Sequence, residues 1–218
     1  MTEGWAVDVP MLVSGCREQG DFGPPGSGFI SEKAFAWPLT RGSFSKWADV
    51  AGLRAVDEVW RLYNSSSSTP RQMWNQLGTD LTLFCGLRAT VEGASPARAS
   101  PIYLNIFSFA ISFVYMGMVD VEGAVEGIDM WLTWGQSAAT IAMGVTLPEE
   151  AVAVGDKFRG FLVEFARTGV LGKQWQPYPA VCEYGGSGLG CSEENSHARA
   201  CAIFDEELGR EKFVLSLG

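Results

Sequence analysis

The segment from Ile102 to Val119 constrains the fold most, because it is a long and mostly apolar stretch of the chain. A membrane-spanning helix needs roughly 20 apolar residues, so this segment is nearly long enough to cross a bilayer. Asn105, Ser108 and Ser112, together with the absence of flanking basic residues, argue against such a span. The first part, Ile102–Phe109, alternates and is rich in aromatic and β-branched residues, which predicts a strand. We therefore expect a strand followed by an apolar contact surface, with membrane association through this segment as an alternative.

The chain is long enough to bury one sizeable hydrophobic core. It has 218 residues, of which 47% are hydrophobic and 19% are charged, as in globular proteins. The formal net charge is −9, and no cluster of Lys and Arg is present. Nucleic acid and anionic membrane surfaces both bind through such clusters, so neither is expected as a partner.

The cysteine and histidine counts argue against a metal site. The sequence has five cysteines, no CxxC pair and one histidine, His197. Zinc sites need several such ligands at close spacing, so no metal is expected and disulfides are the better use of the cysteines. The glycine-rich run Gly185–Gly190 is predicted to be a loop. It has no phosphate-loop spacing and no lysine at its end, so no nucleotide cofactor is expected.

Local patterns predict further strands and helices. Val9–Gly15 is a short apolar run with a proline near its start and a glycine at its end, which predicts a buried strand. Ile30–Tyr63 has helical spacing in two pieces. Leu147–Thr168 is the clearest amphipathic helix, and Glu149 and Glu150 suit its first turn because acidic side chains stabilise the positive end of the helix dipole.

The stretch Val119–Gly135 resembles the histidine loop of the carboxylesterase type B and cholinesterase family. That loop commonly reads GAxHG, followed by an acidic residue and later by an aromatic-glycine pair. The matching residues here are Gly123, Ala124, Gly127, Asp129, Met130, Trp134 and Gly135. The position of the family histidine is held by Glu126. A carboxylate cannot replace the imidazole, which takes the nucleophile's proton near neutral pH and passes it to the leaving group.

Other stretches resemble later parts of the same family. Met73–Val91 is similar to a family helix that carries a cysteine, and Ala198–Leu208 is similar to the closing helix, which carries another. The FxxxFART run before Gly169 and the stretch Trp175–Tyr178 also match. The resemblance implies an α/β chain with a partial α/β-hydrolase fold, made of the later strands of the central sheet plus packing helices. It implies one domain over residues 1–218, the C-terminal portion of a carboxylesterase-like protein.

The resemblance also implies a disulfide. In cholinesterase-like relatives the two helix cysteines are bonded, and they correspond to Cys85 and Cys201 in this chain. Such a bridge favours an oxidising compartment, secreted or luminal. Cys182 and Cys191 flank the glycine-rich run and are candidates for a second bridge, which would leave Cys16 free.

The catalytic positions of the family are degenerate in this chain. The turn after the first strand resembles the family's acid-bearing turn, but the residue before Gly20 is Gln19. Glu18 comes one position early, which turns a strand side chain to the other face. We expect Glu18 to be a solvated turn residue, with a role as substitute acid as the alternative. His197 is expected to be a surface or capping residue. The nucleophile motif GxSxG is absent from the sequence and is expected upstream of residue 1.

These features predict a non-catalytic, carboxylesterase-like protein that acts as a structural or interaction subunit of a larger assembly. The alternative is a carboxylic ester hydrolase, a serine esterase whose nucleophile-bearing half is on a missing or separate segment. In the family the strand at Val9–Gly15 lies inside the sheet, where both of its edges are paired. We therefore expect another protein chain to cover the open edge of this strand and the apolar segment Ala110–Val119.

Overall fold

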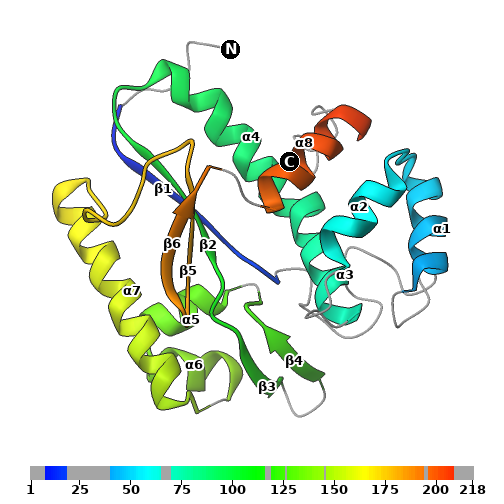
Figure 1. Cartoon of the computed structure of the whole chain (residues 1–218). Helices are drawn as coiled ribbons and strands as arrows, with labels where there is room; N and C mark the ends of the chain where they lie inside the picture. Colours follow the sequence, from blue (N-terminus) through cyan, green and yellow to red (C-terminus); the bar gives the residue numbers. More distant parts are fainter. Residues whose placement is uncertain are drawn as a thin grey trace.

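A four-stranded sheet lies at the centre of the molecule, with helices on both of its faces (Figure 1). The computed structural model describes residues 8–18, 40–64, 70–115, 119–125, 127–144, 146–193 and 196–208. The fold is mixed α/β with a mainly parallel sheet, as the sequence predicts.

The central sheet has the strand order β1-β2-β5-β6. Its strands are β1 (Met11–Cys16), β2 (Ile102–Phe107), β5 (Val181–Gly185) and β6 (Gly188–Ser192). β1, β2 and β5 are parallel, with Met11 opposite Ile102 at the start of the ladder, and β6 runs antiparallel to β5. β1 is therefore one edge of the described sheet, and its first five residues are only partly buried.

β2 is the buried centre of the sheet. Its alternate side chains enter two separate cores, with Ile102, Leu104 and Ile106 on one face and Tyr103 and Phe107 on the other. A parallel strand covered on both faces is mostly apolar, which explains why the sequence around β2 resembles a membrane span. In the parts of the chain that the structure describes, no helix is long and apolar enough to cross a membrane.

Helices from both ends of the chain lie on one side of the sheet, and most of them share a core with β2. They are α1 (Arg41–Ala51), α2 (Val56–Tyr63), α3 (Pro70–Thr79), the π-helical segment η3 (Asp80–Phe84), α4 (Cys85–Ala94), the 3-10 turn η4 (Ser95–Ala97) and α8 (Ser196–Leu208). A disulfide between Cys85 and Cys201, with an S–S distance of 1.99 Å, fastens α8 to the start of α4. This is the pair that the family resemblance implies.

The other face is covered by three consecutive helices, α5 (Ile128–Trp134), α6 (Gln136–Met143) and α7 (Glu149–Thr168). α7 coincides with the predicted amphipathic helix and ends at Gly169, whose φ of 73° lies in the left-handed region. Gly155 lets α7 approach α5 closely, because a Cβ atom there would lie 2.2 Å from the backbone oxygen of Leu132.

The apolar segment after β2 forms a β-hairpin apart from the main sheet. Its strands are β3 (Ile111–Tyr115) and β4 (Val119–Gly123), which pair in antiparallel register. The predicted apolar stretch Ala110–Val119 therefore spans β3 and the first residue of β4. Within it, Ala110 is exposed and Ile111 is buried.

The glycine-rich run predicted as a loop forms the turn and the adjoining strand residues of a second hairpin, so that prediction is wrong. β5 and β6 pair directly, with Gly185 opposite Gly188, and Cys182 and Cys191 are joined across them at an S–S distance of 2.04 Å. The chain can form this tight turn because Gly188 adopts a φ of 102°, which other residues disfavour. Cys16 is buried and belongs to neither bridge.

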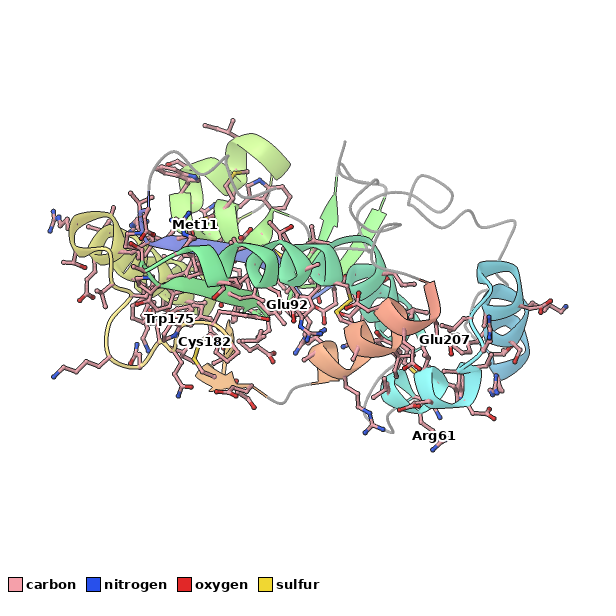
Figure 2. All side chains as sticks on the ribbon, turned by 90° about the horizontal axis from the view of Figure 1, so that it is seen from above. Met11, Arg61, Glu92, Trp175, Cys182 and Glu207 are labelled. Atoms are coloured by element: carbon pink, nitrogen blue, oxygen red, sulfur yellow. A yellow bond between two sulfur atoms is a disulfide. The ribbon has the colours of Figure 1, made fainter. Side chains whose placement is uncertain are left out.

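The start of β1 and the outer part of α2 lie toward opposite ends of the molecule. Figure 2 shows Met11, Trp175 and Cys182 toward one end and Arg61 and Glu207 toward the other. A partner that lies along β1 would therefore leave the outer part of α2 uncovered.

Candidate functional site

The carboxyl ends of β1 and β2 meet the turn that follows β1 and the loop that follows β4. The backbone N–H of Arg17 donates to the carbonyl of Phe107, and that of Glu18 donates to the carbonyl of Ala124, both at 3.0 Å. In open α/β sheets, ligands bind beyond the carboxyl ends of the strands. This end of the sheet is therefore the expected place for a site.

Glu18 is buried at this end, with 2% of its surface exposed. One carboxylate oxygen accepts a hydrogen bond from Arg17 Nε at 2.6 Å, and the other accepts one from the backbone N–H of Ala124 at 2.7 Å. Gly123 makes room for the side chain, because a Cβ atom there would lie 3.0 Å from Glu18 Cγ. The prediction of a solvated turn residue is therefore wrong. The turn returns over the strand ends, so Glu18 faces the loop instead of water.

Arg17 compensates the buried charge of Glu18. Its Nη1 also lies 3.2 Å from Oε1 of Glu183 on β5, so the guanidinium joins two carboxylates. Burial disfavours the charged guanidinium, but the nearby charges of Glu18 and Glu183 outweigh that effect and raise the pKa of Arg17. Arg17 thus stays charged, and the site around Glu18 is an ion-paired cluster.

Of the two degenerate catalytic positions and the possible substitute acid, the structure describes only the substitute acid. Gln19 and Glu126, at the acid and base positions of the family pattern, lie outside the described residues. Glu18, the alternative acid, is in contact with the loop that resembles the histidine loop, through Gly123 and Ala124. A triad acid holds an imidazole in place, whereas Glu18 holds a backbone amide.

His197 lies in a second buried polar cluster. Its Nδ1 is 2.5 Å from Oδ1 of Asp80, and the other oxygen of Asp80 accepts a hydrogen bond from the Tyr63 hydroxyl at 2.6 Å. Asp80 is 1% exposed and His197 is 8% exposed. The prediction of a surface or capping histidine is wrong, because packing of α8 against η3 brings the imidazole onto the Asp80 carboxylate.

The charge of Asp80 controls the two groups that contact it. Burial disfavours the imidazolium of His197, but the Asp80 carboxylate outweighs burial and raises the pKa of His197 above its usual value. Burial, reinforced by the charge of Asp80, raises the pKa of Tyr63. Tyr63 is therefore a neutral hydrogen-bond donor, and His197 is the counter-ion of Asp80 when it is protonated.

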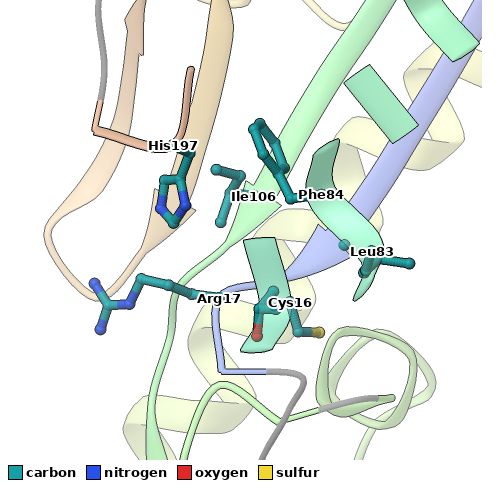
Figure 3. Close-up of a pocket in the computed structure, with 8 residues that line it drawn as sticks. Cys16, Arg17, Leu83, Phe84, Ile106 and His197 are labelled. Carbon is teal, nitrogen blue, oxygen red and sulfur yellow. The ribbon is translucent and has the colours of Figure 1, made fainter. Parts of the chain in front are cut away.

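A small cavity lies between Arg17 and His197 (Figure 3). Its lining residues are Gly15, Cys16, Arg17, Thr79, Leu83, Phe84, Ile106 and His197. Its volume is about 10 Å³, at the lower limit for a single water molecule and far too small for an ester substrate. Burial and the charge of Asp129 raise the pKa of the Cys16 thiol well above its usual value, so this thiol is a poor nucleophile at neutral pH. Among the described residues, no group of three or more side chains could hold a metal ion.

The cluster of Asp80, His197 and Tyr63 was not predicted from the sequence, although the spacing of two of its residues from the cysteines indicates it. Asp80 precedes Cys85 by five residues and His197 precedes Cys201 by four, so each lies about one helical turn from a member of the predicted disulfide. The bridge that joins the two helices therefore also brings the carboxylate and the imidazole near each other.

The comparisons with known proteins agree with the fold. No family model matches the sequence, and no curated protein matches it. Among solved structures, a thermophilic PNB esterase matches with a TM-score of 0.53 and 16% sequence identity. The match covers 89% of this chain and 38% of the esterase chain, so this chain spans well under half the length of that esterase. The likeness shows that the chain forms part of an esterase-like α/β-hydrolase fold.

Proposed function

We propose that the chain is a non-catalytic, carboxylesterase-like subunit that contributes the later strands of a hydrolase sheet to a larger assembly. The bonding of Glu18 supports this proposal most strongly. Both carboxylate oxygens are occupied, one by Arg17 and one by the backbone N–H of Ala124. The acid at this end of the sheet therefore has a structural role, which is to hold the loop against the turn.

The chain also lacks a histidine that could serve as the base of such a site. The sequence has one histidine, and its Nδ1 is held by the buried carboxylate of Asp80. The family base position carries Glu126. A carboxylate there does not replace an imidazole, which takes the nucleophile's proton near neutral pH and hands it on to the leaving group.

The unpaired outer edge of β1 supports the proposal that the chain belongs to a larger assembly. The N–H of Met11 donates to Pro101 and that of Arg17 donates to Phe107, so the intervening residues Leu12 and Ser14 direct backbone polar groups away from β2. The strand reads MLVSGC and has none of the charges or prolines that usually protect a sheet edge. No described strand pairs with this side. We propose that a strand of another protein chain lies there and that the same partner covers the apolar segment Ala110–Val119.

Ester hydrolysis tests the absence of catalysis. The purified chain and its Glu126→Ala variant are compared with a short p-nitrophenyl ester as substrate. Both rates are expected to equal the uncatalysed rate, because no group acts as base. A wild-type rate above that of Glu126→Ala would show that the chain is an enzyme.

A matched pair of variants tests the sheet edge. Leu12→Pro removes an outward N–H group, whereas Leu12→Ala shortens the same side chain and keeps that group. We expect size-exclusion chromatography with light scattering to show that Leu12→Pro lowers the mass of the native assembly and Leu12→Ala does not. Equal masses for both variants would mean that β1 is not the contact.

A serine esterase with its nucleophile on a separate segment is the second candidate. The burial of the Glu18 carboxylate against Ala124 favours it, because an acid belongs at this place in such an enzyme. Labelling with a fluorophosphonate, which reacts with activated serines, separates the two candidates. We expect no labelled serine in the native assembly. Labelling that is lost in Glu18→Gln would support the esterase.

A further inference from the structure

Asn64 begins the sequence Asn64-Ser65-Ser66, which has the N-x-[ST] form of an N-glycosylation acceptor. The chain has four asparagines, and the other three lack this pattern. Gln76 and Leu77 follow Asn75, Ile106 and Phe107 follow Asn105, and Ser196 and His197 follow Asn195. The motif therefore selects a single position.

The structure separates Asn64 from the other described asparagines. Asn64 is exposed at the end of α2, where its backbone N–H donates to the carbonyl of Trp60 at 2.9 Å. No hydrogen bond joins its side-chain amide to another residue in the described part of the chain. Asn75 and Asn105 are 4% and 0% exposed, and Asn105 is bonded to Ser14. Among the described asparagines, the one in the motif is thus also the one that is exposed.

The position of Asn64 gives a bulky group room to extend. Arg61, three residues earlier, lies on the outer side of α2 at the end of the molecule remote from Met11 (Figure 2). Residues three apart lie on one helix face, so Asn64 follows Arg61 toward solvent. Tyr63, between them, is buried and bonded to Asp80. A group on Asn64 would therefore leave both the core and the edge of β1 uncovered.

The disulfides supply a third observation that is independent of the motif. Cys85 is bonded to Cys201 and Cys182 to Cys191, and such bridges persist in oxidising compartments such as the lumen of the secretory pathway. N-glycosylation takes place in that environment and marks surface loops of secreted proteins. Ser65 and Ser66 lie outside the described residues, so the motif is read from the sequence.

We propose that Asn64 carries an N-linked oligosaccharide. The donor would be an oligosaccharide attached through its anomeric carbon to a lipid diphosphate. A bond forms between the amide nitrogen of Asn64 and that carbon, the bond from the carbon to the diphosphate oxygen breaks, and the amide gives up one proton. The lipid diphosphate leaves with the electron pair of the broken bond, so nothing is oxidised or reduced.

Four variants test the proposal against the sequence motif. Asn64→Gln and Ser66→Ala destroy the motif, whereas Ser65→Ala and Ser66→Thr keep it. The full chain is secreted from a eukaryotic host behind a cleavable leader, and each form is treated with peptide-N-glycosidase F. We expect the enzyme to increase the gel mobility of the wild type, Ser65→Ala and Ser66→Thr, and to leave the other two unchanged. Peptide mass spectrometry should find aspartate at position 64 after treatment of the wild type.

Disulfide mapping of the same samples shows whether protein without a sugar on Asn64 has passed through an oxidising compartment. An unmodified Asn64 in secreted protein whose Cys85–Cys201 bridge has formed would overturn the proposal, because the chain would have met the oxidising compartment without receiving the sugar. A mobility shift that persists in Asn64→Gln would also overturn it. Neither result depends on whether the chain is catalytic.

Discussion

Two buried carboxylates, Glu18 and Asp80, are neutralised by different kinds of partner. Glu18 pairs with Arg17, whose guanidinium stays charged at any ordinary pH. Asp80 pairs with His197, whose charge changes near neutral pH. Each cluster also has its own disulfide. Cys85–Cys201 joins the helices that carry Asp80 and His197, and Cys182–Cys191 lies next to Glu183, the second partner of Arg17.

The comparison shows that a buried acid can lie at the end of the sheet without contacting an imidazole. The end of the sheet keeps a buried glutamate in contact with the loop after β4. Its charge, however, is compensated by Arg17 rather than used to orient an imidazole. The only imidazole in the chain serves as counter-ion in the other cluster. We therefore propose that the chain keeps the fold without the catalytic arrangement.

Removing the Cys85–Cys201 bridge should give the largest effect of all, and removing the Cys182–Cys191 bridge a smaller one. The bridged cysteines are 116 residues apart for Cys85–Cys201 and 9 apart for Cys182–Cys191. Because a longer loop loses more entropy on closure, we expect double serine variants to lose about 5 and about 2.6 kcal/mol of unfolding free energy, respectively. Urea denaturation measures both values. Equal losses would mean that chain entropy does not explain the bridges.

Asp80→Ala should be the most damaging single change to the two clusters. It leaves the buried imidazole of His197 and the hydroxyl of Tyr63 without their acceptor, which costs about 3 to 5 kcal/mol for a broken buried pair. Asp57→Ala is the control, because Asp57 is exposed and its pair with Arg41 contributes at most about 1 kcal/mol. If Asp80→Ala does not fold, Tyr63→Phe removes only one hydrogen bond and should cost about 1 kcal/mol. If Tyr63→Phe leaves the free energy of unfolding unchanged, the hydrogen bond from Tyr63 to Asp80 does not stabilise the fold.

Glu18→Ala tests the structural role of the other carboxylate. It leaves the buried N–H of Ala124 without an acceptor, so we expect a loss of about 1 to 3 kcal/mol. Glu18→Gln keeps an oxygen for that N–H and should lose less. Glu183→Ala removes the exposed partner of Arg17 and should cost no more than about 1 kcal/mol. Chemical denaturation compares the three variants, and a loss in Glu18→Ala no greater than that in Glu183→Ala would mean that Glu18 does not hold the loop.

The pH dependence of stability should distinguish the clusters by their cations. The pKa of folded His197 is raised above its usual value near 6.5, so its contribution is complete below that value and is lost as the pH rises through the folded pKa. Each unit of difference between the folded and unfolded pKa contributes about 1.4 kcal/mol. We expect this decline to disappear in His197→Gln and to persist in Glu18→Gln. Urea denaturation over a pH series measures it, and an unchanged profile in His197→Gln would rule out the imidazolium as counter-ion.

Local patterns predicted α7 and β2, whose buried faces can be recognised from the spacing of apolar residues. The amphipathic spacing of α7 and the apolar run of β2 are readable because each element faces a core along its whole length. The family resemblance supplied the pairing of Cys85 with Cys201, which no local pattern contains.

The two carboxylate clusters could not be predicted in the same way. Counting alternate residues along β1 predicted that Glu18 faces away, but the strand ends at Cys16 and the two-residue period does not continue through the turn. His197 is near the start of α8, and its burial depends on how α8 packs on η3. The burial of Glu18 and of His197 depends on tertiary packing, so it can be seen only in the structure.

The most direct test of the central claim is the ester hydrolysis rate of the chain in the assembly from which it is isolated. A p-nitrophenyl ester is the substrate, and the wild type is compared with Glu126→Ala and His197→Gln. If the chain keeps the fold without the chemistry, all three assemblies hydrolyse the ester at the same rate per mole of this chain. A tenfold or greater loss of rate in either variant, with the assembly intact by light scattering, would contradict the account.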